Sequence, residues 1–161
     1  MPLAVGDSIP NVKLMTMTSE GPSPIHSEDV LGAGNVVLFA VPGAFTPGCS
    51  QQHLPGYVSR ADEILAKGVD RIACIAVNDA FVMDAWGQAN DVGDRILMLG
   101  DPDAEFAAAA GMELDASSFG LGTRSLRYAA ILDDGVVRDL FLEDDGVSVA
   151  ASSADAVLTK L

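Results

Sequence analysis

The chain has 161 residues, of which 23 are acidic and 9 are basic, so its formal net charge at pH 7 is −14. A chain of this length fits a single domain, residues 1–161, which can bury roughly 70% of the surface that the unfolded chain exposes without help from a metal or a disulfide. The negative charge repels nucleic acid and anionic lipid, so we expect neither as a partner.

The N-terminal part of the chain predicts an extended arm and then a buried strand. Residues 11–18 alternate loosely between apolar and polar types and lie between two turn-rich stretches, 6–10 and 19–24, which indicates a short edge strand in a hairpin. Residues 36–41 form a continuous apolar run that ends at Pro42, as in a strand that is buried on both faces.

A helix is expected to begin soon after that strand. Thr46 is a good N-cap and Pro47 suits the first helical position, so Cys49 falls in the first turn. The Pro-Gly step at residues 55–56 is expected to interrupt this helix. The prediction is therefore one or two turns around Cys49, a kink, and a longer amphipathic helix over residues 57–67.

Strands and helices alternate through the rest of the chain. The predicted elements are a strand over 71–77, a helix capped by Asn78 or Asp79 that runs to about residue 90, a strand over 96–99 and an alanine-rich helix over 104–110. Two further strands, 128–132 and 136–142, are joined by an Asp-Gly hairpin step, and a last helix covers 152–161. This order predicts an α/β fold with a central mixed β-sheet, helices on both of its faces and an N-terminal hairpin.

Cys49 is the residue that we expect to carry chemistry. The unpaired N–H groups of a first helical turn and the positive end of the helix dipole favour an anion, so a thiol there loses its proton more readily than a free thiol. The alternative is that Cys49 is a small apolar residue of the core. The glycines and prolines of residues 42–48 favour a shaped loop instead, and a thiolate is the nucleophilic form of cysteine.

The two cysteines, Cys49 and Cys74, are too few for a secreted disulfide scaffold and are typical of a reducing compartment. The N-terminal residues lack the basic start and the long apolar run of a signal peptide or a membrane-spanning helix. We therefore expect a cytoplasmic location and no contact with a membrane.

The order Pro42-x-x-x-Thr46-x-x-Cys49, between a strand and a helix, resembles the active-site motif of the peroxiredoxins. The longer string VPGAFTPGCSQQHLPGY is similar to the atypical type II group, which includes the plant glutaredoxin-dependent enzymes. The likeness extends from about residue 36 to the end, through KGVDRIACIAVNDAFVMDAW, GLGTRSLRYAAIL and SSADAVL. It implies a thioredoxin-like fold, the reduction of hydrogen peroxide and alkyl hydroperoxides by Cys49, and a homodimer packed through its active-site side.

The residue roles that the resemblance implies also make chemical sense. Sulfur attacks one peroxide oxygen while negative charge develops on the other, so the site needs a thiolate and hydrogen-bond donors. The Thr46 hydroxyl can donate to the sulfur or to a peroxide, or it can simply cap the helix, and both interpretations stay open. Pro42 is expected to wall the pocket against water, and Phe45 and Gly48 are expected to contact the substrate.

Two arginines near residues 128–132 compete for one role. Arg127 opens that strand and matches the catalytic arginine of the family, so we expect it to stabilise the thiolate and the departing oxygen. Arg124, three residues earlier, is its rival, and is otherwise expected beside the substrate as a loop or dimer contact. We favour Arg127. His53 lies four residues after Cys49 on the same helical face and is expected to have a structural role.

Cys74 lies inside a predicted buried strand and is expected to be inert rather than a resolving cysteine. A disulfide needs Cα atoms within about 7 Å, whereas Cys49 starts a helix at a strand end and Cys74 sits in the middle of a strand. Animal-type members of the family carry a resolving cysteine in the C-terminal segment, where this chain has Ala151. The resemblance therefore implies a one-cysteine cycle in which an external thiol, glutathione with glutaredoxin or thioredoxin, reduces the sulfenic acid.

Other candidate signals are weak. The acidic groups at 133–134 and 143–145 are expected to be solvated turns, and with two histidines and two cysteines we expect no metal and no cofactor. A rival function is a peroxide sensor or redox relay that passes the oxidation of Cys49 to a partner protein. A disulfide reductase is disfavoured because the chain has no Cys-x-x-Cys.

Overall fold

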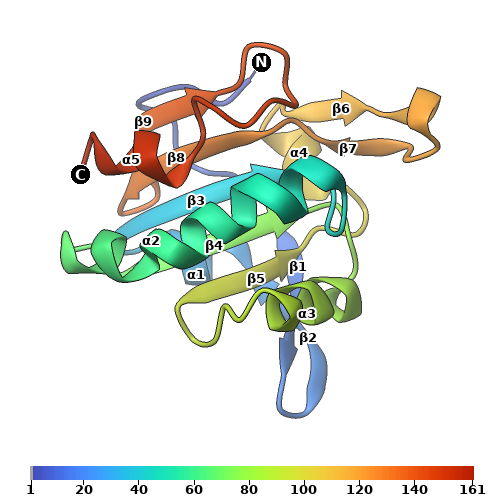
Figure 1. Cartoon of the computed structure of the whole chain (residues 1–161), viewed down its shortest axis with the longest axis horizontal. Coiled ribbons are helices and arrows are strands. Elements are labelled where there is room, and N and C mark those ends of the chain that lie inside the picture. The colour runs from blue at the N-terminus through green and yellow to red at the C-terminus, as the bar shows by residue number, and fades with distance from the viewer. Residues whose placement is uncertain (1) are drawn as a thin grey trace.

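A seven-stranded sheet in the order β2-β1-β5-β4-β3-β8-β9 forms the centre of the computed structural model, which describes residues 2–161. The inner strands β3 (Asn35–Val41), β4 (Arg71–Ala76) and β5 (Ile96–Gly100) run parallel to one another. The strands that flank them, β8 and β1, run antiparallel to their neighbours. The predicted mixed α/β sheet is therefore confirmed (Figure 1).

At one edge of the sheet, β1 (Lys13–Thr18) pairs with β2 (Gly21–His26) in an N-terminal hairpin. The hairpin is confirmed, but its second strand replaces the turn-rich stretch that the sequence predicts over 19–24. Pro22 and Pro24 suggest a turn because proline has no backbone N–H. They are compatible with β2 because it is the outermost strand, where one side of the backbone needs no strand partner.

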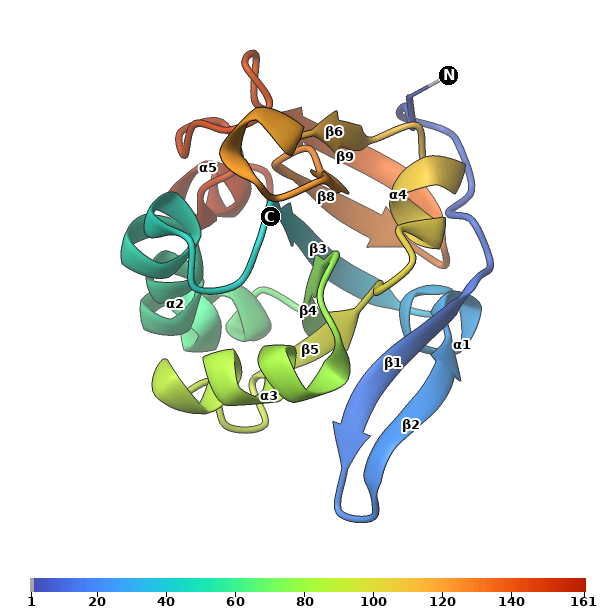
Figure 2. The same cartoon turned by 90° about the vertical axis from the view of Figure 1, so that its right-hand side faces the viewer.

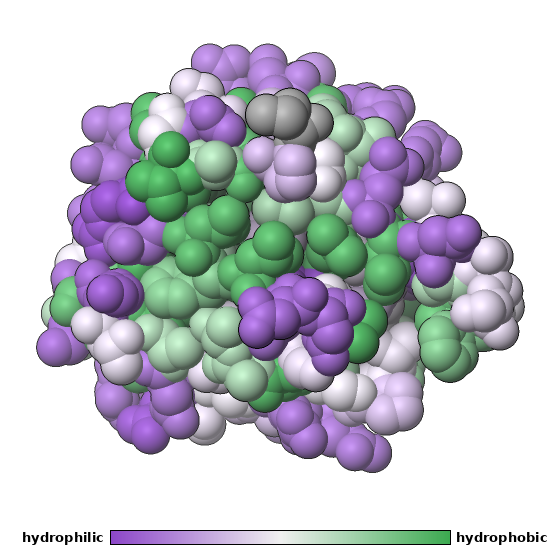
Figure 3. Space-filling model, turned by 90° about the horizontal axis from the view of Figure 1, so that it is seen from above, coloured by the Kyte–Doolittle hydropathy of each residue, from purple (hydrophilic) through white to green (hydrophobic). Residues whose placement is uncertain are grey.

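At the opposite edge, β8 (Tyr128–Asp133) pairs with β9 (Val136–Leu142). The connecting residues Asp134 and Gly135 have φ angles of 47° and 79°, as expected for the tight turn that an Asp-Gly step favours. Figure 3 looks from above onto the side that carries β9 in Figure 1, and hydrophobic residues gather on this side.

Helices cover both faces of the sheet, and Figure 2 shows the two groups on either side of it. One core layer lies under α2 (Leu54–Ala66), α3 (Ala80–Ala89) and α5 (Ala154–Leu158), and the other under α1 (Ser27–Leu31) and α4 (Glu105–Ala109). Successive residues of β3 point to opposite faces, so Phe39 packs in the first layer and Leu38 in the second. A strand covered on both sides is apolar along its length, which explains the run seen in the sequence.

The sequence pattern does not predict four of the short elements. These are α1, a turn of 3-10 helix at Ser117–Phe119, and a separate two-stranded sheet of β6 (Glu113–Asp115) and β7 (Thr123–Ser125). Elements of three to five residues are too short to show a hydrophobic period. The last helix is shorter than the predicted 152–161: it begins only after Ser153, whose hydroxyl accepts a hydrogen bond from the backbone N–H of Ala156, and it ends at Leu158.

The predicted break at Pro55 is replaced by a π-helical turn. Helical geometry begins at Pro47, so Cys49 is the third helical residue as predicted, and the π-helical turn Cys49–His53 passes directly into α2. In an α-helix the ring of Pro55 would meet the carbonyl of residue 51. The wider turn, in which the Leu54 N–H donates to the carbonyl of Cys49, accommodates the ring without ending the helix.

Candidate active site

Cys49 lies where the loop that leaves β3 enters the helix, and its exposed fraction is 0%. Two side chains reach its sulfur. Thr46 Oγ1 and Arg127 Nη2 each lie 3.0 Å from Cys49 Sγ. The fold therefore brings the predicted nucleophile together with Arg127, the arginine that we favoured, from 78 residues downstream, and with Thr46 from three residues upstream.

The Thr46 hydroxyl lies between two acceptors. Its Oγ1 is 2.7 Å from the carbonyl oxygen of Gly43 and 3.0 Å from Cys49 Sγ. A hydroxyl carries one proton, so it donates to one of these acceptors at a time. Thr46 directly precedes the first helical residue, but within the described chain its hydroxyl accepts no backbone N–H. The sequence leaves two roles open for the Thr46 hydroxyl, a donor to the sulfur or a helix cap, and this geometry fits the donor.

Arg127 is buried, with 3% of its surface exposed, and makes three directed hydrogen bonds. Its Nε donates to the carbonyl of Val147 at 2.8 Å, Nη1 to His53 Nδ1 at 2.8 Å, and Nη2 to Cys49 Sγ at 3.0 Å. A guanidinium has five N–H groups, so two are left for a bound molecule as far as the described residues show.

The charge of Arg127 favours an anion at Cys49. No ion pair joins this guanidinium to a carboxylate within residues 2–161. A buried cation without an anionic partner is costly, whereas a thiolate 3.0 Å away compensates it. The surroundings of Cys49 therefore stabilise the nucleophilic form of the sulfur.

His53 holds Arg127 in this orientation. A guanidinium can only donate, so Nδ1 of His53 accepts and the ring proton lies on Nε2, which donates to the carbonyl of Ser152 at 3.0 Å. Burial, and then the nearby Arg127 charge, lowers the pKa of His53 to about 4. The ring is therefore neutral at pH 7 and keeps its acceptor. Its hydrogen bonds go to Arg127 and Ser152, in line with the structural role that we expected.

We predict that His53 makes the fold less stable as the pH falls. Its pKa is about 4 when folded against 6.5 ordinarily, so between these values the unfolded state binds a proton that the folded state does not. Stability should fall through this window by on the order of 3 kcal/mol. His53→Gln keeps one acceptor and one donor and should lose this part of the pH dependence. Urea unfolding of both proteins from pH 7 to pH 4 measures the difference, and parallel curves would contradict it.

Arg124 braces the loop before the helix and makes no hydrogen bond to the sulfur. Its Nη1 donates to the carbonyl of Val77 at 2.8 Å and its Nε to the carbonyl of Leu121 at 2.9 Å. A Cβ placed on Gly43 would lie 3.4 Å from Nη1, so the guanidinium packs against this loop. Of the two rival arginines, Arg127 is the one that contacts Cys49.

The remaining predicted site residues shape the surroundings of Cys49. Pro42 is buried directly after β3. Phe45 is 56% exposed, has a φ of 65° that is uncommon for a residue other than glycine, and lies with its ring 6.5 Å from that of the buried Trp86. Gly48 permits a close approach, because a Cβ there would lie 3.2 Å from Arg127 Nη2. Contact of these residues with a substrate stays a prediction.

The sequence does not reveal the segment that supports Arg127 from behind. Residues 146–152 supply the carbonyl for Nε of Arg127 and, at Ser152, a carbonyl that accepts from both His53 and Tyr57. Glu143, which we expected in a solvated turn, is only 4% exposed and accepts hydrogen bonds from this segment, so that expectation was wrong. A glutamate beside two aspartates and a glycine has the composition of a surface turn, and only its tertiary contacts distinguish it.

The site around Cys49 does not coincide with the large cavity of the structure. A cavity of about 610 Å³ lies at the amino ends of β4 and β5, beside Arg71 and Ile96, and no predicted site residue lines it.

Within residues 2–161, no group of three or more His, Cys, Asp or Glu side chains is placed to hold a metal ion. None of the helices described is both long and apolar enough to cross a bilayer.

Comparison with known proteins places the whole chain among relatives. The family model described as Redoxin matches residues 4–158. The chain is 47% identical over 157 residues to Peroxiredoxin-2E, chloroplastic, of Arabidopsis thaliana, covering 95% of this chain and 67% of that protein. It is 49% identical over 164 residues to Peroxiredoxin-2E-2, chloroplastic, of Oryza sativa subsp. japonica, covering 99% and 72%. The crystal structure of reduced Prx3 in complex with H2O2 from Vibrio vulnificus matches with a TM-score of 0.93 at 49% identity, over 98% of each chain.

Proposed function

The chain belongs to the redoxin family as a peroxiredoxin similar to the plant type II proteins, and on this premise we propose how its residues divide the work of peroxide reduction. The chain is a thiol peroxidase with Cys49 as its peroxidatic cysteine, and its thioredoxin-like fold is the one expected. The roles of the other site residues, the reductant and the assembly are proposals.

The first half-reaction transfers an oxygen atom to Cys49. The thiolate sulfur attacks the terminal oxygen of the hydroperoxide, a sulfur–oxygen bond forms and the oxygen–oxygen bond breaks. The second oxygen leaves as hydroxide or alkoxide and takes up a proton to give water or an alcohol. Cys49 is left as a sulfenic acid.

We assign the stabilisation of this charge movement to Arg127 and Thr46. The observation that carries the assignment is that both donors lie 3.0 Å from the sulfur, while Arg127 keeps two N–H groups for another oxygen. Donors fixed in a water-poor site act on developing charge without reorganising. Arg124 is assigned to the support of the loop, and Pro42, Phe45 and Gly48 to the shape of the entrance.

We propose that an external thiol, glutathione with glutaredoxin or thioredoxin, completes the cycle. The thiol forms a mixed disulfide with the sulfenic acid and releases water, and a second thiol then frees the Cys49 thiolate. Cys74 does not suit the first of these steps. It is fully buried in β4, and desolvation, followed by the charge of Cys49, raises the pKa of the Cys74 thiol well above its ordinary value. Ala151 offers no thiol in its place.

Because Cys49 is buried, the protein must open locally before an external thiol can reach the sulfur. With an exposed fraction of 0%, the sulfur is open to a small peroxide only through local fluctuation, and a thiol of the size of glutathione needs a larger opening. The sulfur belongs to the π-helical turn Cys49–His53, whose hydrogen bonding is less regular than that of an α-helix. We propose that this turn unwinds when the reductant binds.

We predict that Cys74→Ala keeps full turnover with at least one of these reductants. Alanine removes the second sulfur without placing a hydroxyl in the core. Hydrogen peroxide consumption is measured for wild type and variant, with glutathione plus glutaredoxin and with thioredoxin. Loss of turnover with every reductant in a folded variant would contradict the one-cysteine cycle. A single round of oxidation that ends in a mixed disulfide with one partner protein would favour the relay function.

We also propose a homodimer that packs through the active-site side. Three phenylalanines, Phe45 after β3, Phe81 in α3 and Phe119 between β6 and β7, are 56%, 65% and 82% exposed, and aromatic side chains are enriched in the contacts between protein chains. Sedimentation equilibrium tests this proposal. The cytoplasmic location and the single-domain organisation are proposed with it, supported by two free cysteines and by one main sheet that takes strands from both ends of the chain.

A further inference from the structure

The carboxylate of Glu143 binds residues 150–152, the end of the segment 146–152 that supports Arg127. Glu143 Oε2 accepts from the backbone N–H groups of Ala150 at 2.9 Å and Ser152 at 2.8 Å, and from Ser152 Oγ at 2.5 Å. Glu143 Oε1 accepts from the N–H of Ala151 at 3.1 Å. Four donors from three consecutive residues therefore converge on a single buried side chain.

The charged form of Glu143 is the one that fits these donors. Burial by itself raises the pKa of this carboxyl, but the hydrogen bonds from Ser152, Ala150 and Ala151 outweigh it and hold the pKa below its usual value. A carboxylate accepts only, so it satisfies all four donors, and hydrogen bonds to a charged acceptor are stronger than neutral ones.

The carbonyl of Ser152, whose position Glu143 fixes, connects residues 150–152 to the side chains around Cys49. It accepts from His53 Nε2 at 3.0 Å and from Tyr57 Oη at 2.8 Å. His53 Nδ1 in turn accepts from Arg127 Nη1 at 2.8 Å. The position of the Ser152 carbonyl therefore sets the orientation of the His53 ring, and the ring sets that of the guanidinium.

The start of the same segment holds Arg127 a second time. The carbonyl of Val147 accepts from Nε at 2.8 Å, and the carbonyl of Gly146 accepts from the backbone N–H of Arg127 at 2.8 Å. Three nitrogens of Arg127 thus depend on residues 146–152, directly or through His53. The remaining nitrogen, Nη2, is the one that contacts Cys49.

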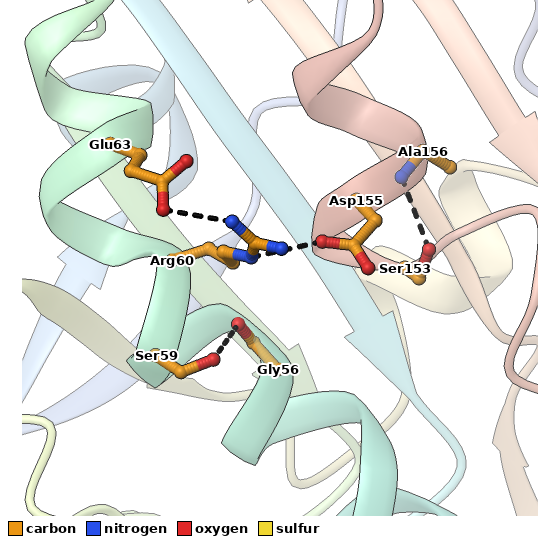
Figure 4. Close-up of polar contacts among 7 residues, drawn as sticks. All are labelled: Gly56, Ser59, Arg60, Glu63, Ser153, Asp155 and Ala156. Atoms are coloured by element: carbon orange, nitrogen blue, oxygen red, sulfur yellow. Dashed lines mark hydrogen bonds and ion pairs between the residues drawn. The ribbon is translucent and has the colours of Figure 1, made fainter.

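Asp145 holds the start of the segment, through the N–H groups of Val147 and Ser148, and the ion-pair group that follows the segment does not replace Glu143 at residues 150–152. Figure 4 shows Arg60 of α2 between Glu63 and Asp155, and Ser153 capping α5. The Arg60 guanidinium lies 2.9 Å from the Glu63 carboxylate and 3.0 Å from that of Asp155. The side chains of this ion-pair group are 43–73% exposed, so solvent screens their attraction. They dock α5 on α2 without a hydrogen bond to residues 146–152.

We propose that Glu143 is a positioning residue for peroxide reduction. It holds residues 150–152 so that the Ser152 carbonyl orients His53, and through His53 turns the guanidinium of Arg127 toward the Cys49 sulfur. Glu143 acts at a distance through these side chains and makes no hydrogen bond to the sulfur. The inference rests on the role proposed above for Arg127.

Glu143→Gln tests the proposal. The amide keeps the shape but presents an NH2 group to a site where only donors converge, so part of the cluster loses its partner. We expect the second-order rate constant for oxidation of Cys49 by hydrogen peroxide to fall about ten-fold, as for a residue that acts through others. We also expect the rate of Cys49 alkylation by iodoacetamide at pH 7, which depends on the nucleophilic form of the sulfur, to fall. A purely structural glutamate would lower stability without changing this alkylation rate.

Two further variants make the outcome unambiguous. Asp155→Asn removes an exposed carboxylate three residues after Ser152 and should leave the oxidation and alkylation rates of Cys49 at their wild-type values. Ser152→Ala removes one of the four hydrogen bonds, keeps the carbonyl, and should shift both readouts in the same direction by less, which provides the test if Glu143→Gln fails to fold. Wild-type rates of Cys49 oxidation and alkylation in folded Glu143→Gln, or in Ser152→Ala if it alone folds, would overturn the proposal.

The failure of this inference can be told from the failure of the proposed function. If Arg127→Gln slows oxidation while Glu143→Gln does not, the positioning role of Glu143 is wrong and the role of Arg127 stands. If neither variant slows oxidation, the role proposed for Arg127 is wrong, and the inference about Glu143 is overturned with it.

Discussion

Replacing Cys49 with serine is expected to abolish peroxide consumption. The serine oxygen nearly matches the shape of the sulfur, but an alcohol does not ionise at neutral pH, even beside Arg127 and the start of a helix. Without an ionised nucleophile the first half-reaction has no attacking atom. We therefore expect no turnover above the rate without enzyme, with hydrogen peroxide or an alkyl hydroperoxide and with any thiol reductant.

The control for this experiment is the other cysteine. Cys74→Ala removes the second sulfur of the chain and should retain turnover, and near-ultraviolet circular dichroism of both variants establishes that each is folded. Sustained peroxide consumption by folded Cys49→Ser would place the chemistry at another residue and would remove the assignment of Cys49.

The segment around Cys49 shows what sequence can predict and where it stops. The strand, the loop and the start of the helix depend on local properties, an apolar run followed by glycines, prolines and a threonine, and all three are confirmed. The π-helical turn depends on packing as well. The helix must turn Leu54 and Tyr57 toward the core and also leave room for the ring of Pro55. The residue types near Cys49 do not show that both requirements have to be met together.

Arg127 and Glu143 differ in the same way. Arg127 could be singled out because it matches a family position at the start of a strand, and the structure brings it to the sulfur. Glu143 could not be, because its partners lie seven to nine residues later and are mostly backbone N–H groups, which leave no trace in the residue types. The same holds for β2, whose prolines suggest a turn until its place at the sheet edge is known.

Replacing Arg127 is expected to cause the second large loss of activity. Arg127→Gln removes the charge and the forked donors while leaving the backbone bond to Gly146 in place. Loss of a single donor to developing charge in an active site typically lowers the rate by about 10²–10³ fold, and we expect a fall of this size in the rate constant for Cys49 oxidation. Alkylation of Cys49 by iodoacetamide at pH 7 should also become slower, because the buried cation that compensates the thiolate is gone. Stopped-flow oxidation and the alkylation rate measure the two effects separately.

Arg127→Lys separates charge from geometry. A lysine ammonium restores the positive charge but not the planar set of donors that reaches Val147, His53 and the sulfur together. We therefore expect Arg127→Lys to recover most of the alkylation rate of Cys49 and only part of its oxidation rate, since the departing oxygen still lacks its aimed N–H groups. Arg138→Gln, on the exposed side of β9, is the matched control and should behave as wild type. A wild-type rate in Arg127→Gln together with a large loss in Arg124→Gln would transfer the role to Arg124.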